Sequence, residues 1–305
     1  MRALVTGSGG FVGRHLVAHL EEAGDEVLAW SGGSETPDIT DGEALRDALS
    51  GQRIDAVYHL AAQSRVDLSW EEAALTMQVN AGGTAQLIDA LADAELHPRV
   101  IVMSSAEVYG RVDPDRMPID ESTPLSPRTP YGVSKAAAEQ LARLTGERHG
   151  LPVLVCRPFN LIGPGQAPMF VTAAFAQQIV ANERRGGGEL RVGNLDPSRD
   201  FLDVRDAVAW YRRLMLDGES GKTYNVSSGR DMAVRAVLDT MVRRSTVEQR
   251  VVVDPDRFRP NDVERFVGSN DAIVAATGWE PTRPLEQSLI DVLDDWRQRP
   301  QEDFR

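Results

Sequence analysis

A glycine-rich turn between an apolar run and an amphipathic helix constrains the fold more than any other feature of the chain. The run Arg2–Thr6 is followed by glycines at positions 7, 10 and 13, spaced G-x-x-G-x-x-G. The first glycine permits a tight strand-to-helix turn, the second lets the backbone approach a pyrophosphate, and the third lets the helix pack closely on the sheet. The turn therefore predicts a dinucleotide-binding site at the helix N-terminus. Its expected residues are Gly7, Gly10, Phe11, Val12 and Gly13.

Short β-branched runs alternate with longer amphipathic segments in the first half of the chain, as in βαβ units around a parallel sheet. One of the longest helices is expected over residues 70–94. After about residue 165, short strands and helices interleave. We therefore predict an α/β fold, a Rossmann-type doubly wound parallel sheet with a smaller α/β C-terminal substrate lobe. The expected domains are 1–165 plus about 203–230 for the dinucleotide, and about 166–202 plus 231–305 for the substrate.

Composition narrows the range of partners and compartments. The net charge of −13 argues against a nucleic acid or an anionic membrane as partner. The single cysteine, Cys156, cannot form an intrachain disulfide, which fits a reducing compartment. We find neither an apolar run of membrane-spanning length nor a signal-like leader, so a cytoplasmic protein is expected. The histidines are scattered and no Cys/His cluster exists, so no metal site is predicted.

Tyr131 and Lys135 form the second informative motif. Residues four apart share a face of a helix, and Pro130 fits a helix start, so the phenol and the ammonium should point into the same space. The pKa of free tyrosine is near 10, about three units too high for efficient acid/base work at neutrality. A neighbouring lysine cation would favour the phenolate and lower that pKa. The pair therefore predicts an acid/base site.

These motifs together resemble the short-chain dehydrogenase/reductase superfamily, whose Y-x-x-x-K motif Tyr131–Lys135 matches. Ser104–Gly110 is similar to the S-S-x-x-V-Y-G stretch of the extended branch. The resemblance implies an NAD(P)-dependent oxidoreductase in which Tyr131 is the acid/base and Lys135 also holds the nicotinamide ribose. It assigns the catalytic hydroxyl to Ser105 and a structural role to Ser104, with the exchanged assignment left open.

The same resemblance implies further cofactor contacts. Asp38 and Ile39 resemble the adenine-contacting pair of the superfamily, although a turn aspartate after Pro37 is an equal alternative. Asn80 is similar to the asparagine of an N-x-x-G-T helix, which is more often a structural hydrogen-bonder than a catalyst. The small residues expected beside the ribose are Leu60, Ala61 and Ala62.

The end of the second predicted strand bears on the choice of cofactor. NAD-specific sites usually place a carboxylate there to bind the ribose 2′-hydroxyl. Here Trp30 is followed by Ser31 and two glycines, with no carboxylate before Glu35. That leaves room for a 2′-phosphate beside Ser31, where Arg14 is a candidate partner. We therefore expect NADP(H) in preference to NAD(H).

Three later segments resemble the nucleotide-sugar-modifying enzymes of the extended branch. Arg157–Gln166 is similar to their R-x-F-N-x-x-G-P-G segment, Val192–Val204 to their V-G-N-L…R-D-F-x-D-V stretch, and Arg259-Pro260 to their R-P. In those enzymes the asparagine touches the sugar diphosphate and the arginines pair with it, a task suited to a planar guanidinium. The implied substrate-binding residues are Ser64, Asn160, Val171, Asn194, Arg199 and Arg259.

Within that branch, Ala62–Val66 with Ser69-Trp70 is most similar to the GDP-mannose group, and Thr277–Pro281 looks most like its reductases. The implied reaction is NAD(P)H-dependent reduction of the C4 ketone of GDP-4-keto-6-deoxy-D-mannose, giving GDP-D-rhamnose. A nucleotide-sugar 4-epimerase or a 4,6-dehydratase with retained NAD(P) is the alternative.

Dehydratases of this branch carry two acid/base groups after the catalytic hydroxyl. Ser105-Ala106-Glu107 lacks the first of them but keeps Glu107 as a candidate catalytic group. A non-enzymatic NAD(P)-sensing protein is a remote alternative, because such members lose the tyrosine or the lysine. The resemblance also implies a homodimer in which 70–94 and 131–149 pair across a two-fold axis.

Overall fold

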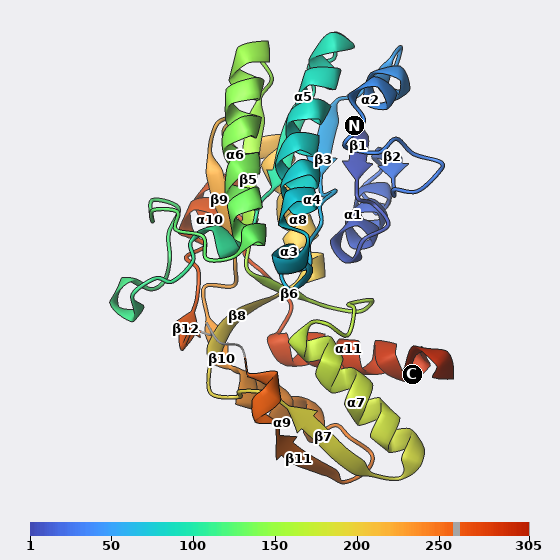
Figure 1. The fold of residues 1–305 in the computed structure, drawn as a ribbon, viewed down its shortest axis with the longest axis vertical. Helices are drawn as coiled ribbons and strands as arrows, with labels where there is room; N and C mark the ends of the chain where they lie inside the picture. Colours follow the sequence, from blue (N-terminus) through green and yellow to red (C-terminus); the bar gives the residue numbers. More distant parts are fainter. Residues whose placement is uncertain (259–262, 305) are drawn as a thin grey trace.

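A computed structural model describes residues 1–258 and 263–304 of the chain. Its larger layer is a parallel sheet of six strands, which lie side by side across the upper half of Figure 1. Most residues of these strands are apolar and buried, because both faces of the sheet are covered by helices. In spatial order they are β2 (Glu26–Trp30), β1 (Arg2–Thr6), β3 (Ala56–His59), β4 (Arg99–Met103), β5 (Val153–Pro158) and β9 (Thr223–Val226).

Helices cover both faces of this sheet, and each face forms its own hydrophobic cluster with the helices that pack on it. One face packs against α1 (Phe11–Glu22), α8 (Val204–Asp217) and α10 (Asp271–Thr277), with Trp210 fully buried among them. The other face packs against α2 (Gly42–Leu49), α5 (Gly83–Asp93) and α6 (Pro130–His149). The predicted doubly wound parallel α/β fold is confirmed.

The second layer lies below the first in Figure 1 and has its own core. Trp296, Phe175 and Leu190 are buried there between helices and short strands. The strands are β6 (Asn160–Ile162), β8 (Ser198–Asp203), β10 (Asp231–Ala233) and β12 (Arg265–Phe266), with β7 (Gly188–Val192) and β11 (Gln249–Val253) as a separate pair. The helices are α7 (Val171–Arg185), α9 (Val234–Val242) and α11 (Leu285–Gln298).

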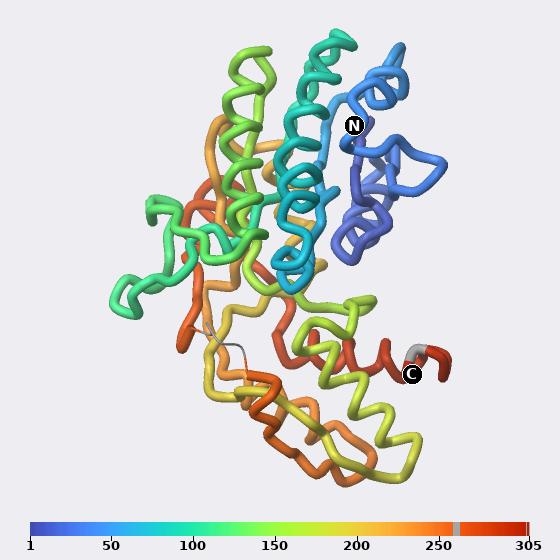
Figure 2. The backbone as a smooth tube through the Cα atoms, in the orientation of Figure 1, coloured from blue at the N-terminus to red at the C-terminus, as the bar shows by residue number. Residues whose placement is uncertain are grey.

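The chain crosses between the two layers more than once, as the tube in Figure 2 shows. After building β6, α7, β7 and β8 it returns to the first sheet with α8 and β9, then leaves again for β10 and α9. The N-terminus lies at the first sheet and the C-terminus at the second layer. The domain boundaries expected from the sequence remain a prediction.

The helix expected over residues 70–94 is present, but it is interrupted at Glu72 and contains a π-turn. That stretch is divided into α3 (Leu68–Glu71), α4 (Ala73–Met77), a π-helical turn at Gln78–Gly82 and α5. Glu72 leaves helical geometry, with φ −124° and ψ 50°, which separates α3 from α4. In the π-turn, the Asn80 amide turns inward to bind neighbouring segments, and a widened turn accommodates that contact.

Two structural findings concern ligands and membranes. Within residues 1–258 and 263–304, no helix combines the length and apolar character that crossing a membrane requires. Over the same residues, no group of three or more His, Cys, Asp or Glu side chains could hold a metal ion. Cys156 is buried in β5.

Candidate active site

Ser105, Tyr131 and Lys135 converge at the carboxyl end of β4. Tyr131 and Lys135 lie in the first two turns of α6, which begins at Pro130 and is capped by the Thr129 hydroxyl, the acceptor of a 2.9 Å hydrogen bond from the Gly132 N–H. Ser105 follows β4 and opens a 3₁₀ turn. Its side chain lies against the Tyr131 phenol and lowers the pKa of that phenol. The structure thus places the hydroxyl beside the phenol, with Lys135 one turn further along the same helix.

Burial dominates the electrostatics of this group. It raises the pKa of Tyr131 to about 12, an effect that the Ser105 hydrogen bond reduces and the Glu107 charge increases. This direction is opposite to the one expected from Lys135, because loss of hydration penalises the phenolate and Lys135 is not among the groups that act on the Tyr131 pKa. Burial also lowers the pKa of Lys135 to about 8, against the raising effect of Glu139. Near neutral pH, Tyr131 is therefore a proton donor beside a mostly cationic lysine.

Ser104 faces away from the phenol, into a buried ionic network. Its hydroxyl donates to Glu139 on α6, and Glu139 also accepts two hydrogen bonds from Arg157, at 2.9 Å and 2.7 Å. Ser104 thus makes the structural contact and Ser105 the contact with Tyr131, as position matching implied. The sequence prediction did not include Glu139. Its spacing of four residues from Lys135 was the available signal.

A second missed contact orients the start of α6. The Ser69 hydroxyl, fully buried on α3, accepts a 3.1 Å hydrogen bond from the Tyr131 backbone N–H. The Asn80 amide donates to the Ser134 hydroxyl at 2.8 Å and to the Gln63 carbonyl at 3.0 Å. Asn80 is therefore a structural hydrogen-bonder that holds the loop after β3 against α6.

The glycine-rich turn has the tight geometry that its spacing predicts. Gly7 has φ +70°, and a Cβ there would lie 2.7 Å from the Ala61 backbone nitrogen. A Cβ on Gly13 would lie 2.2 Å from the Gly7 carbonyl oxygen, so only glycine allows this approach of helix and turn. No side chain caps α1 at Gly10, which leaves the N–H groups of its first turn, at Phe11 and Val12, available to a phosphate. These residues fit a dinucleotide cofactor.

A cavity of about 380 Å³ lies between this turn and the end of β2. The Arg14 guanidinium borders it, donating to the Gly9 carbonyl at 2.6 Å and to the Gly165 carbonyl at 3.3 Å. Ser31 also borders it, so both groups considered for a ribose 2′-phosphate face one space. The full lining is Ser8, Gly9, Arg14, Val17, Ala18, Glu21, Ala29 and Ser31.

The remaining predicted cofactor residues lie along the same sheet edge. Asp38 accepts two 2.8 Å hydrogen bonds from the N–H and hydroxyl of Thr40, which lower the pKa of its carboxyl. The turn role proposed for Asp38 is therefore present, and its adenine contact remains a prediction. Ile39 packs on Gly83, where a Cβ would lie 2.9 Å from Ile39 Cγ2. Leu60, Ala61 and Ala62 follow β3 directly and are partly buried.

His59 is the last residue of β3, directly before Leu60, and its imidazole is neutral. It is buried between the hydroxyls of Thr6, at 2.8 Å, and Thr84, at 2.9 Å. Burial lowers its pKa to about 3, and the Lys135 cation contributes to that lowering. His59 is therefore a neutral link between the ends of β1 and β3 and α5.

Four of the predicted substrate residues, Asn160, Val171, Asn194 and Arg199, belong to the second layer. Asn160 on β6 donates to the Asp200 carbonyl at 2.8 Å, and Arg199 precedes Asp200 on the neighbouring strand β8. The Asn194 side chain accepts the Asp196 N–H at 3.1 Å, and Val171 opens α7. Ser64 is exposed after β3. Arg259 lies outside the described residues.

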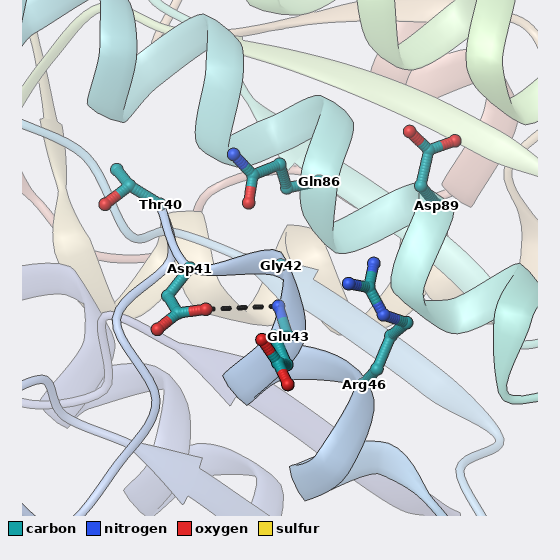
Figure 3. A pocket seen from close by; sticks show the side chains of 7 residues that line it. All are labelled: Thr40, Asp41, Gly42, Glu43, Arg46, Gln86 and Asp89. Atoms are coloured by element: carbon teal, nitrogen blue, oxygen red, sulfur yellow. Dashed lines mark hydrogen bonds between the residues drawn. The ribbon is translucent and has the colours of Figure 1, made fainter.

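A larger cavity of about 570 Å³ contains none of the predicted site residues (Figure 3). It lies between the start of α2 and the exposed side of α5, and its lining is Thr40, Asp41, Gly42, Glu43, Arg46, Gln86 and Asp89. Two of its carboxylates are already bonded within the fold. Asp41 caps α2 through the Glu43 N–H at 3.1 Å, and Asp89 binds His149 at 2.9 Å. This cavity is therefore separate from the glycine-rich turn and from Ser105, Tyr131 and Lys135.

Comparisons with known proteins give matches over almost the whole chain. The family described as GDP-mannose 4,6 dehydratase matches residues 4–292. A GDP-6-deoxy-D-mannose reductase from Pseudomonas aeruginosa is 40% identical over 304 residues, covering 99% of each chain. The solved structure of RMD from the same organism, complexed with NADPH, superposes with a TM-score of 0.91 at 39% identity, over 98% of this chain and 99% of that one.

A more distant solved structure binds the other nicotinamide cofactor. It is a UDP-glucose 4-epimerase of Thermus thermophilus in complex with NAD, with a TM-score of 0.85 at 29% identity. The match covers 98% of this chain and 99% of that one. The fold is thus shared by relatives of different substrate and cofactor, and the assignment of function has to come from the site.

Proposed function

This chain belongs to the GDP-mannose 4,6-dehydratase family of extended short-chain dehydrogenases/reductases, and from that membership we propose that it reduces the C4 ketone of GDP-4-keto-6-deoxy-D-mannose to give GDP-D-rhamnose. The observation that carries the proposal is the placement of the Ser105 side chain against the Tyr131 phenol, with Lys135 one turn further along α6 and the glycine-rich turn on the same sheet. Full-length similarity to a GDP-6-deoxy-D-mannose reductase supports the choice of substrate.

In this reaction Tyr131 donates the proton and Ser105 orients the ketone. A bound reduced nicotinamide supplies the hydride. The Tyr131 phenol holds its proton at neutral pH and gives it to the oxygen at C4 as negative charge develops there. Ser105 directs the same oxygen by hydrogen bonding, and the Lys135 ammonium stabilises the negative charge that passes to Tyr131. The electrons end in the new C–H bond, and the proton ends on the new hydroxyl.

We propose NADPH as the preferred cofactor. The glycine-rich turn and the first turn of α1 would hold the pyrophosphate, and Lys135 the nicotinamide ribose. Arg14 and Ser31 border the cavity beside the end of β2, where a 2′-phosphate would lie. The NADPH complex of the similar Pseudomonas aeruginosa structure supports this choice, whereas the NAD complex of the epimerase concerns a more distant relative.

The nucleotide sugar is proposed to bind along the second layer. Asn160 and Arg199 would contact the diphosphate, with Ser64, Val171 and Asn194 beside the sugar or base. These assignments rest on the family motifs and on the adjacency of β6 and β8. A GDP-linked substrate is favoured by the similarity to the reductase.

The position after Ser105 favours reduction over dehydration. Ala106 is buried in a cluster with Val108, Tyr109 and Phe159, so no second acid/base group stands there. Glu107 remains, and its charge acts on Tyr131. A 4,6-dehydratase or a 4-epimerase with retained cofactor stays the alternative, since both occur among the relatives.

A mixing experiment tests the proposed function. Purified protein is incubated with GDP-4-keto-6-deoxy-D-mannose and either NADPH or NADH, and the reduced-nicotinamide absorbance is followed. We expect stoichiometric oxidation of the cofactor with formation of a GDP-6-deoxyhexose, faster with NADPH. Absence of oxidation with both cofactors, together with turnover of GDP-mannose or a UDP-hexose without added cofactor, would transfer the assignment to the alternative.

A further inference from the structure

A buried ion pair lies directly behind the proposed catalytic group. Glu139 is fully buried on α6, one turn after Lys135, and its carboxylate binds Arg157 of β5 at 2.9 Å and 2.7 Å. The same carboxylate accepts the hydroxyl of Ser104, the residue before Ser105. The proposed reaction uses none of these three side chains. Paired charges without solvent are unfavourable unless their geometry is well satisfied, so their presence here calls for a reason.

We infer that Glu139 is a positioning residue: its carboxylate keeps Lys135 cationic and fixes Ser105 through Ser104. This inference rests on the proposed function, in which Lys135 and Ser105 serve the reduction. Glu139 touches neither substrate nor cofactor in this scheme, and acts through its neighbours.

The electrostatic part follows from the groups that face Lys135. From its own helix, Glu139 raises the pKa of Lys135, while burial lowers it to about 8. From β3, His59 faces the lysine in the neutral form, because burial lowers its pKa to about 3. Glu107 acts on Tyr131. Among the described residues, Glu139 is thus the anion that opposes the cost of burying the lysine charge.

Cations also face Glu139 itself. Arg157 approaches it from β5, and Arg143 lies one turn beyond it on α6, whereas Lys135 lies one turn before it. Arg157 binds the carboxylate directly, whereas the Arg143 guanidinium bonds to Gly221 and Thr223 instead.

The mechanical part follows from the chain of hydrogen bonds beyond Glu139. Arg157 donates to the Tyr109 hydroxyl at 2.9 Å, and that hydroxyl donates to Asn225 at 2.7 Å. Tyr109 follows the 3₁₀ turn that carries Glu107, and Asn225 lies on β9. The network thus fixes the ends of β4, β5 and β9 relative to the catalytic helix.

The chain offers a direct test, because Lys135 and Lys222 are its only two lysines. Competitive labelling of amines with acetic anhydride, read by mass spectrometry across pH, reports the pKa of each. In Glu139→Gln we expect the labelling midpoint of Lys135 to fall by about one pH unit. Lys222, whose side chain is 57% exposed, is the internal reference and should not shift. An unchanged Lys135 midpoint would overturn the inference.

This readout requires no turnover, so it remains valid if the proposed substrate is wrong. If the wild-type protein does reduce the ketone, Glu139→Gln should lower kcat about tenfold or more, with little change in KM. The pH at which kcat begins to fall should decrease by the same amount as the labelling midpoint of Lys135.

Two further variants separate positioning from general stability. Asp25→Asn breaks another buried ion pair, with Arg212 at 2.7 Å, and should leave the Lys135 midpoint unchanged. Glu139→Gln leaves Arg157 without its charge partner and could impair folding. The double variant Glu139→Gln/Arg157→Met removes both charges, and it should recover thermal stability while keeping the lowered Lys135 midpoint. Recovery of both stability and the wild-type midpoint would show a merely structural role and overturn the inference.

Discussion

At the residue scale, the protonated state of Tyr131 favours reduction of a ketone over oxidation of an alcohol. A phenol with a pKa of about 12 is a poor base at neutral pH and is well suited to donate a proton once negative charge develops on a bound ketone. Lys135, with a pKa of about 8, is the group of the pair that titrates near physiological pH. The lysine, and not the tyrosine, should therefore control the pH dependence of reduction.

Reduction should slow as pH rises through about 8. Below this pKa Lys135 carries its charge and supports Tyr131; above it the charge is lost, while Tyr131 keeps its proton until about pH 12. A profile of kcat against pH checks this, with Lys135→Arg as the comparison, since a guanidinium stays charged over the whole range. A wild-type rate that is flat from about pH 7 to about pH 10 would contradict the assignment to Lys135.

Removing the phenolic hydroxyl should abolish most of the activity without harming the fold. We expect Tyr131→Phe to lower kcat by roughly 10²–10⁴-fold, the usual contribution of a positioned general acid. NADPH binding, measured by fluorescence titration, should be retained because the ring remains in place. A variant that keeps more than half of the wild-type kcat would show that another group supplies the proton.

At the scale of elements, the glycine-rich turn depends on the absence of side chains at the β1–α1 junction. A Cβ on Gly13 would lie 2.2 Å from the Gly7 carbonyl oxygen, so α1 would have to move away from the turn. Gly13→Ala should therefore weaken NADPH binding about tenfold or more and lower the thermal midpoint.

Gly82 is the matched control for that substitution. A Cβ there meets nothing within 4 Å, and its helical backbone suits alanine. Gly82→Ala should be neutral or stabilise the protein by about 0.5–1 kcal/mol, with unchanged NADPH affinity. Equal loss of NADPH binding in the two variants would mean that the loss does not come from the turn. Calorimetric titration with NADPH provides both affinities.

Elements with a strong local pattern were predictable from the sequence, and contacts between distant segments were not. Buried β-branched runs and the glycine-rich turn identify the central strands and the first βαβ unit, because their signals are local. The π-turn between α4 and α5 escaped prediction, since its Asn80 amide binds Gln63 and Ser134, which lie far from it in the sequence. Glu139 escaped for the same reason: Ser104 and Arg157 meet it only in the folded sheet.

At the scale of the whole molecule, we propose that two copies of the chain associate through α3, α4 and α6. These helices carry large apolar side chains on the outer surface, including Trp70, 60% exposed, and Leu144, 63% exposed. A two-fold axis that pairs these helices would bury such side chains against their equivalents.

Leu144→Glu should convert that dimer into a monomer, because two glutamates would face one another across the axis. Sedimentation velocity at micromolar concentration measures the change. Leu216→Glu, at an exposed leucine on α8, is the control and should remain dimeric. A wild-type protein that already sediments as a monomer would remove the proposed interface.

The interleaving of the two layers has a consequence for how the protein is made. The edge strand β9 of the first sheet, residues 223–226, follows β6, α7, β7 and β8 of the second layer, and the helix α10 that covers it, residues 271–277, follows all of that layer except α11. A ribosome working from the N-terminus therefore cannot release a finished nucleotide-binding half early, as it can for proteins whose domains are consecutive. While β6, α7, β7 and β8 are being translated, β5 has no partner strand on its outer edge, and α10 is added to the first sheet only near the end of synthesis.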